Sequence, residues 1–187
     1  MKKINIKKAG LLILLGFLSI CVITNAQDIK PDKLSKKEAK KAKSTADFYS
    51  LDSLLNFKSY VLEANYLENK YGSMAVVTST LNFIRVTGYN GVLQTGSDYR
   101  VGYNSVGGVT AEGTVNNYKI ARDLKNLRFT VTFNLFTNLG NFDVMMNVSA
   151  DSNATATITG TTSGRLTWRG HLVPLNKSRV FKGMNTI

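Results

Sequence analysis

The sequence predicts an all-β domain, an antiparallel meander of about eight strands, preceded by a signal peptide and a basic N-terminal helix. Two observations carry this prediction. From residue 58 onward apolar and polar side chains alternate with period two, which is typical of half-buried strands. Short turn-like stretches separate these segments, and no helical pattern lies between them. We therefore expect residues 1–26 to form a signal peptide, 27–57 a basic helical linker and 58–187 the β domain.

The first 26 residues contain the three parts of a cleavable secretory signal. The positive start consists of Lys2, Lys3, Lys7 and Lys8. An apolar stretch over 9–23 and a short exit over 24–26 follow, with cleavage expected before Gln27. A membrane anchor is the alternative, but the apolar stretch is shorter than the roughly 20 residues that a span requires. The pattern predicts export to the periplasm or cell envelope, with no transmembrane segment after cleavage.

Cys21 is the only cysteine and raises the alternative of a lipid anchor. The residues before it partly resemble a bacterial lipoprotein signal, yet Ile20 is larger than the residue that such a signal prefers. We interpret Cys21 as part of the apolar segment that is removed with the signal. The mature chain then has no disulfide, and its core alone must stabilise the fold.

The segment after the signal is rich in lysine. The net charge of +12 falls to +8 in the mature chain, because the signal removes four lysines and no acid. Ser35 and Glu38 form a capping-box pattern that predicts a helix start. A basic helix suits nucleic acid or an anionic membrane. Here its apolar face is mostly alanine before Leu51 and no aromatic residues interleave with the lysines, so we favour a solvated linker helix and expect no nucleic-acid partner.

The expected strands cover 60–66, 75–86, 91–95, 109–115, 127–135, 142–148, 154–158 and 166–172. A turn is expected at 87–91, where Asn90-Gly91 is a hairpin signal, and further turns are expected at 123–126, 138–141, 151–153 and 162–164. A meander of this length curls into a barrel-like, lipocalin-type domain, since closure removes unpaired strand edges. A two-sheet sandwich is the alternative. An eight-stranded barrel is filled by its own side chains or holds one small ligand.

Three stretches of the chain resemble a known family. They are 57–66 behind a lysine/alanine helix, the glycine/tyrosine-rich run from Tyr99 to Tyr103 that leads through Gly107-Gly108 into 113–118, and 163–172. Together they resemble domain-of-unknown-function family 4251, a group of exported proteins of Bacteroides-type Gram-negative bacteria, over about 35–173. The resemblance implies a barrel-like antiparallel domain behind an N-terminal helix, in the periplasm or envelope. It implies no activity and no site residues.

The residue content gives little support for catalysis. His171 is the only histidine, and the alternation places it on one face with Arg165 and Arg169, opposite Trp168. The expected mature chain offers no cysteine or second histidine to complete a dyad or a metal site. The carboxylates are sparse and lack the spacing of an acid/base pair. We expect no enzyme, metal or cofactor. A hydrolase is the alternative, and it would require distant acids to converge with Arg165, Arg169 or His171.

Aromatic residues near the loops suggest ligand binding. The candidate ligand-binding residues are Tyr89, Tyr99, Arg100 and Tyr103, which would gather at one mouth of the barrel. Alternatively, these tyrosines cap the core where loops meet it. Two functions follow. One is a non-enzymatic binding domain for a small apolar ligand or a protein partner. The other is a structural or interaction module with a filled core.

Overall fold

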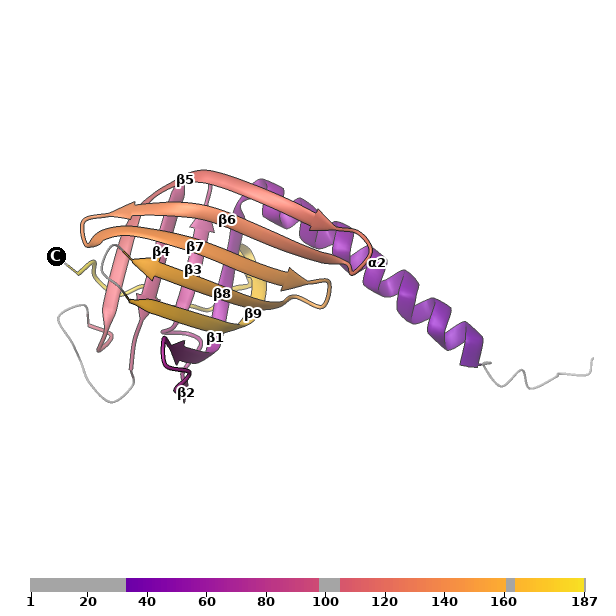
Figure 1. Ribbon diagram of the computed structural model, residues 1–187, viewed down its shortest axis with the longest axis horizontal. Helices are drawn as coiled ribbons and strands as arrows, with labels where there is room; N and C mark the ends of the chain where they lie inside the picture. The colour runs from indigo at the N-terminus through magenta and orange to yellow at the C-terminus, as the bar shows by residue number, and fades with distance from the viewer. Residues whose placement is uncertain (1–32, 98–104, 161–163, 187) are drawn as a thin grey trace, which may run out of the picture. The chain divides into compact units, whose positions relative to one another are not determined.

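The computed structural model describes residues 33–97, 105–160 and 164–186 (Figure 1). The chain divides into two compact units, 1–36 and 37–187, and all the strands belong to the second. The elements are α2 (Lys33–Phe57), β1 (Ser59–Asn69), β2 (Met74–Val76), β3 (Phe83–Thr87), β4 (Asn90–Thr95), β5 (Val109–Asp123), β6 (Arg128–Thr137), β7 (Gly140–Ser149), β8 (Asn153–Gly160), β9 (Arg165–Pro174) and the short 3₁₀ helix η1 (Leu175–Lys177).

The strands form one closed antiparallel sheet. Its order is β1-β3-β4-β5-β6-β7-β8-β9, and β9 pairs back with β1, while β2 extends the pairing of β1 as an extra strand. The predicted antiparallel barrel is confirmed, and the sandwich is excluded. Two strands carry register shifts, at Ala64–Tyr66 in β1 and at Asn116–Lys119 in β5, where Asn117 has a φ of 53°. Such bulges increase the local bend and twist of a strand, which helps a sheet to close.

The predicted strand over 75–86 is wrong as a single element. Its ends belong to β2 and β3, and residues 77–82 form the connection between them. The prediction for 109–115 is too short, because β5 continues to Asp123. The bulge in β5 reverses the parity of the inward positions: Val115 is buried before it, and Tyr118 and Ile120 pack against the core after it. A strict period-two pattern therefore ends before the strand does.

The β3–β4 hairpin turns at Gly88-Tyr89, inside the predicted turn over 87–91 and two residues before its Asn90-Gly91 signal. Asn90 already pairs with Thr87, and Gly91 lies within β4. A Cβ on Gly91 would lie 2.6 Å from Leu135 Cδ1 and 2.8 Å from Val115 Cγ2. A larger residue at 91 would have to displace these two side chains, and the turn itself uses Gly88, whose φ is 60°.

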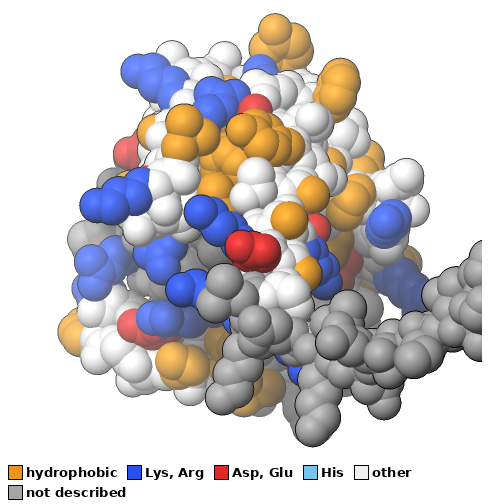
Figure 2. Space-filling view, turned by 90° about the vertical axis from the view of Figure 1, so that its right-hand side faces the viewer, with side chains coloured by type: hydrophobic (Ala, Val, Ile, Leu, Met, Phe, Trp, Pro, Cys, Tyr) orange, Lys and Arg blue, Asp and Glu red, His pale blue; other side chains and the backbone are white. Residues whose placement is uncertain are grey.

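The last turns of α2 are part of the barrel core. Phe48, Leu51 and Leu55 are buried in the main apolar cluster, and the Phe48 ring stacks on Phe129 with centroids 4.3 Å apart. Residues 35–43 of the same helix are exposed. The helix begins at Lys33, two residues before the start that the Ser35–Glu38 pattern predicts. Within the described ranges, no helix combines the length and the apolar character that a membrane span requires. On the face drawn in Figure 2, basic side chains are more prominent than acidic ones.

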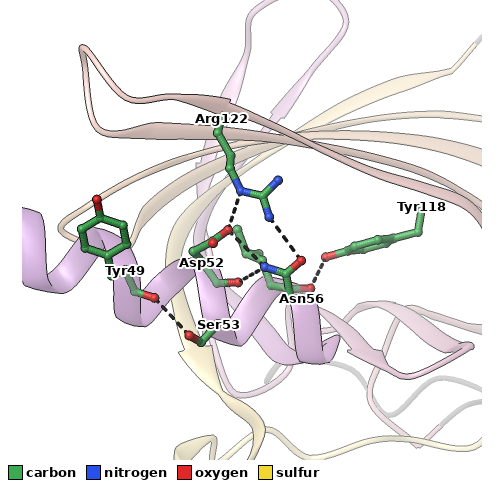
Figure 3. A network of polar contacts seen from close by, with 7 residues as sticks. Tyr49, Asp52, Ser53, Asn56, Tyr118 and Arg122 are labelled. Atoms are coloured by element: carbon green, nitrogen blue, oxygen red, sulfur yellow. Dashed lines mark hydrogen bonds and ion pairs between the residues drawn. The ribbon is translucent and has the colours of Figure 1, made fainter.

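Polar contacts fix the end of α2 against the barrel (Figure 3). Arg122 Nε donates to Asp52 Oδ1 at 2.7 Å, and Arg122 Nη2 donates to Asn56 Oδ1 at 3.2 Å. The Tyr118 hydroxyl, on β5, donates to the Leu55 carbonyl oxygen at 2.9 Å and lies 3.3 Å from the buried Tyr60 hydroxyl. Burial raises the pKa of Tyr118 to about 12 and raises the pKa of Tyr60 well above its ordinary value. We call this part of the barrel the sealed end.

The C-terminal segment after β9 covers part of the outer barrel surface. Val61, Phe83 and Val92 form a second buried cluster, against which Val180 packs. Gln94, fully buried, anchors the segment: its amide donates to the carbonyl oxygens of Leu81 and Phe181, and its Oε1 accepts from Thr110 and from the Gly183 N–H. Lys182 pairs with Glu112 on β5. Every hydrogen-bonding group of the Gln94 amide therefore has a partner.

Candidate functional site

A mostly apolar hollow of about 340 Å³ lies at the barrel end opposite the sealed end. The two ends of β4 relate the hollow to the sealed end. The turn before β4 lies beside Lys58, which directly follows α2. Thr95, the last residue of β4, lines the hollow. The remaining lining residues come from β4, the start of β5, the start of β7, the end of β8, the start of β9 and the residue before β9. They are Leu93, Val109, Ala111, Phe142, Ile158, Gly160, Gly164, Arg165, Leu166 and Trp168. We call this region the open end.

Small residues at two inward positions of the open end leave space among the larger lining side chains. Ala111 on β5 pairs with Leu93 on β4. Gly160 ends β8 without a side chain. At the sealed end, the inward space is taken by large side chains such as Phe48, Phe129 and Tyr60. The hollow is the space that the small residues leave unfilled.

Trp168 is the most distinctive residue of the hollow. It is 2% exposed and lines the hollow from β9. Its indole Nε1–H has no hydrogen-bond partner in the described part of the chain. A buried donor without a partner loses its hydration without compensation, at a cost of about 1–3 kcal/mol. Arg165, also on β9, is exposed and is the one charged side chain among the lining residues that the structure describes.

The predicted ligand-binding residues do not form this site as a group. Tyr89 lies in the β3–β4 turn next to the sealed end, is 74% exposed, and has the Lys58 Nζ 4.7 Å from its ring centroid. Lys58 Nζ is also 4.9 Å from the ring centroid of Tyr118. Tyr89 is therefore placed at the end of β4 away from the hollow. Tyr99, Arg100 and Tyr103 lie outside the described residues.

His171 lies on a second, polar hollow of about 410 Å³ on the outer barrel surface. Its lining includes Arg128, Asn147 and Arg169, and His171 is exposed while Trp168 is buried, as the alternation predicts. Arg169 Nη2 is 2.7 Å from Glu68 Oε2. No carboxylate lines this hollow within the described ranges. In the same ranges, no group of three or more His, Cys, Asp or Glu side chains is arranged to hold a metal ion.

Sequence reasoning missed the hollow although it predicted several of its residues as inward-facing. Phe142, Ile158, Leu166 and Trp168 belong to alternating stretches whose apolar side was expected to face the core. The available signal was the combination of Ala111 and the two glycines at 160 and 164 with a single tryptophan. That signal becomes informative only when the register brings these residues of three strands to one end.

The fold defines this protein as a closed, eight-stranded antiparallel barrel that α2 seals at one end and that is hollow at the other. A family model described as "Domain of unknown function (DUF4251)" matches residues 42–172, and the chain belongs to this family. A crystal structure of a DUF4251 family protein from Bacteroides eggerthii DSM 20697 is similar, with 32% sequence identity and a TM-score of 0.60, covering 73% of this chain and 93% of that one. No curated protein matches the chain.

Proposed function

We propose that this protein is a non-enzymatic binding protein of the cell envelope that takes a small apolar ligand into the hollow at the open end of the barrel. The observation that carries the proposal is the hollow itself, whose volume of about 340 Å³ falls within the range of roughly 300–1,000 Å³ that is typical of ligand sites. Its lining consists mainly of aliphatic and aromatic side chains, with few polar groups.

The energetic reason is the burial of apolar surface. An apolar molecule that leaves water for this hollow gains about 25 cal/mol for each Å² of apolar surface that is buried. The barrel is already closed, so the wall around Leu93, Ile158 and Trp168 is formed before the ligand arrives, and little ordering of the protein opposes binding. The chain provides a preformed site rather than a surface that must rearrange.

The envelope location in the proposal rests on the sequence of residues 1–26, with its lysine-rich start, apolar stretch and short exit. Reading the N-terminus of the mature protein by mass spectrometry tests it. We expect a chain that begins at Gln27, whereas a lipidated chain that begins at Cys21 or an uncleaved chain would contradict this expectation.

The binding proposal is tested by filling the hollow. Ala111, which is buried and lines the hollow, is changed to Leu, and Ala121, which is exposed on the same strand outside the hollow, receives the same change as a matched control. Ethylbenzene is titrated into each protein while the fluorescence of the single tryptophan is recorded. We expect saturable binding by the wild type and by Ala121→Leu, and at least tenfold weaker binding by Ala111→Leu. Equal binding by all three proteins, or binding by none, would contradict the proposal.

A further inference from the structure

We propose that the polar hollow on the outer barrel surface, in which His171 lies, binds a neutral saccharide. This hollow measures about 410 Å³ and is lined from β1, β6, β7, β8 and β9. It shares no lining residue with the apolar hollow of the open end, so the inference does not depend on what binds there. Its lining combines amide and hydroxyl side chains with the ring of Tyr66. Groups of these kinds match the hydroxyl groups and the ring of a sugar.

The polar hollow is a groove between outward-facing side chains of neighbouring strands. Its floor includes Val148, Ala154 and Gly170, which pair side by side across β7, β8 and β9. Val148 and Ala154 bury their side chains in the core, and Gly170 has no side chain, so little rises from this row toward solvent. The residues before and after them in each strand face outward and form the sides of the groove.

A bulge in β1 brings two further side chains to the groove. The register of β1 with β9 shifts between Ala64 and Tyr66, so Asn65 has no partner on β9. A Cβ on Gly170 would lie 1.9 Å from the Glu63 carbonyl oxygen, so a side chain at 170 would collide with the backbone of β1 beside the bulge. Asn65 and Tyr66 both line the hollow. The bulge therefore directs two consecutive residues to one surface, as bulges beside functional sites do.

Two asparagines of the lining are held with opposite hydrogen-bonding groups left for a ligand. The Thr130 hydroxyl donates to Asn147 Oδ1 at 2.8 Å, which leaves the Asn147 NH₂ group as a donor. Asn153 Nδ2 donates to Asp151 Oδ2 at 2.5 Å, which leaves Asn153 Oδ1 as an acceptor. A hydroxyl group donates and accepts at the same time. The hydroxyl groups of a sugar can therefore use both asparagines, whereas an apolar ligand can use neither.

The two arginines of the lining favour an uncharged ligand over an anion, because each has a carboxylate beside it. Arg169 donates from Nε and Nη2 to Glu68 Oε2, at 3.2 and 2.7 Å. Arg128 stands opposite Asp123 across β5 and β6. An anion at either arginine would be repelled by the neighbouring carboxylate, and this repulsion does not act on a neutral hydroxyl group.

Tyr66 provides the apolar contact of the site. Its side chain is 43% exposed and stands opposite Arg169 on β9. An aromatic ring presents a large apolar face, on which the C–H groups of a sugar ring can pack, while its hydroxyl remains polar. The strands that carry these side chains are paired within the closed barrel, so the groove is formed before the sugar binds.

The experiment titrates four neutral trisaccharides, maltotriose, cellotriose, mannotriose and chitotriose, into ¹⁵N-labelled protein. Trigalacturonate is the anionic comparison. We expect at least one neutral trisaccharide to bind saturably, more tightly than trigalacturonate, and to shift the side-chain amide resonances of Asn65 and Asn147. Asn65→Ala and Asn147→Ala identify these resonances by their loss.

Matched variants test the two kinds of contact. Tyr66→Ala should weaken binding of that trisaccharide about tenfold through loss of the aromatic contact. Tyr71→Ala, at an 82% exposed tyrosine between β1 and β2, should leave it unchanged. Asn147→Ala should weaken binding about fivefold, as for the loss of one neutral hydrogen bond. Asn116→Ala, at an exposed asparagine on β5 outside the hollow, is its control.

Three outcomes would overturn the inference. They are no binding by any of the four neutral sugars, tighter binding of trigalacturonate than of all four, and amide shifts confined to residues outside the polar hollow. Equal binding by Tyr66→Ala and Tyr71→Ala would also overturn it. The resonance shifts are measured on the wild type, so the test holds even where a variant does not fold. Binding of ethylbenzene at the open end is a separate measurement, and its failure would leave the saccharide inference standing.

Discussion

The two ends of this barrel are built from the same kind of strand but differ in what fills them. At the sealed end, the last turns of α2 bring Phe48, Leu51 and Leu55 into the core, and Tyr118 bonds the helix carbonyl of Leu55. At the open end, small residues leave about 340 Å³ unfilled next to an indole N–H without a partner. The comparison shows that large side chains fill one end of the barrel while the other end keeps a hollow, and it is this hollow that the proposed binding function requires.

The largest expected effect lies at the sealed end. Leu55→Ala removes a side chain with 0% exposure and leaves a cavity, so we expect the free energy of unfolding to fall by about 2–5 kcal/mol. Leu124→Ala, in the exposed turn between β5 and β6, is the control and should change it by less than about 0.5 kcal/mol. Urea denaturation measures both. Equal effects of the two changes would show that the helix end is not part of the core.

A second prediction applies the same substitution to tightly packed and hollow positions. Ala156 is fully buried, so Ala156→Leu should force its neighbours apart and lower the free energy of unfolding by about 1–3 kcal/mol. Ala111→Leu points into unfilled space and should lower it by less than about 1 kcal/mol. Denaturation curves of the two variants give the two free energies of unfolding that are compared. A larger loss for Ala111→Leu would mean that the hollow is not available space.

A third prediction concerns the hydrogen bond that Tyr118 donates to Leu55 at the sealed end. Tyr118→Phe removes the hydroxyl and should lower the free energy of unfolding by about 1 kcal/mol. Tyr71→Phe, at an exposed tyrosine, is the matched control and should have almost no effect. A loss of the same size in the control would argue against the role of this hydrogen bond.

The pKa of Tyr118 gives the most gradual effect. Because burial raises this pKa to about 12 from the ordinary value of 10.0, the folded protein holds its proton over a pH range in which the unfolded chain has lost it. The resulting stabilisation is complete below about pH 10 and is lost as the pH rises toward about 12. Tyr60, whose pKa is also raised, acts in the same direction. Tyr118→Phe should flatten the fall in stability between these pH values, as measured by urea denaturation at each pH.

The sequence predicted the barrel because the alternation of apolar and polar residues is a pattern within single strands. Phe129, Val131, Phe133 and Leu135 alternate with polar residues within one strand, and each of them is buried. The observed turn lies within the predicted 87–91, but two residues before its Asn90-Gly91 signal. Asn90-Gly91 has the composition of a turn, whereas Gly91 packs closely against Leu135 from a distant strand, a contact that cannot be recognised without the register.

The sequence did not predict the hollow, for a related reason. The volume left at the open end depends on Ala111, Gly160 and Trp168, which lie on three different strands and meet only once the barrel has closed. The same holds for the helix, because Phe48 and Leu51 have the spacing of a helix face, but their burial depends on the barrel end that receives them. Tyr89 was grouped with Tyr99 by nearness in sequence, and the intervening strand β4 carries the chain away from Tyr89 to the other end of the barrel.

The most direct test of binding at the open end is native mass spectrometry of the protein purified gently from its own envelope fraction, beside Ala111→Leu prepared in the same way. The account predicts that the wild type carries a small apolar mass in addition to the chain, and that the filled variant lacks it. A wild-type protein without any additional mass, or the same additional mass on both proteins, would contradict the claim that the hollow at the open end is the binding site.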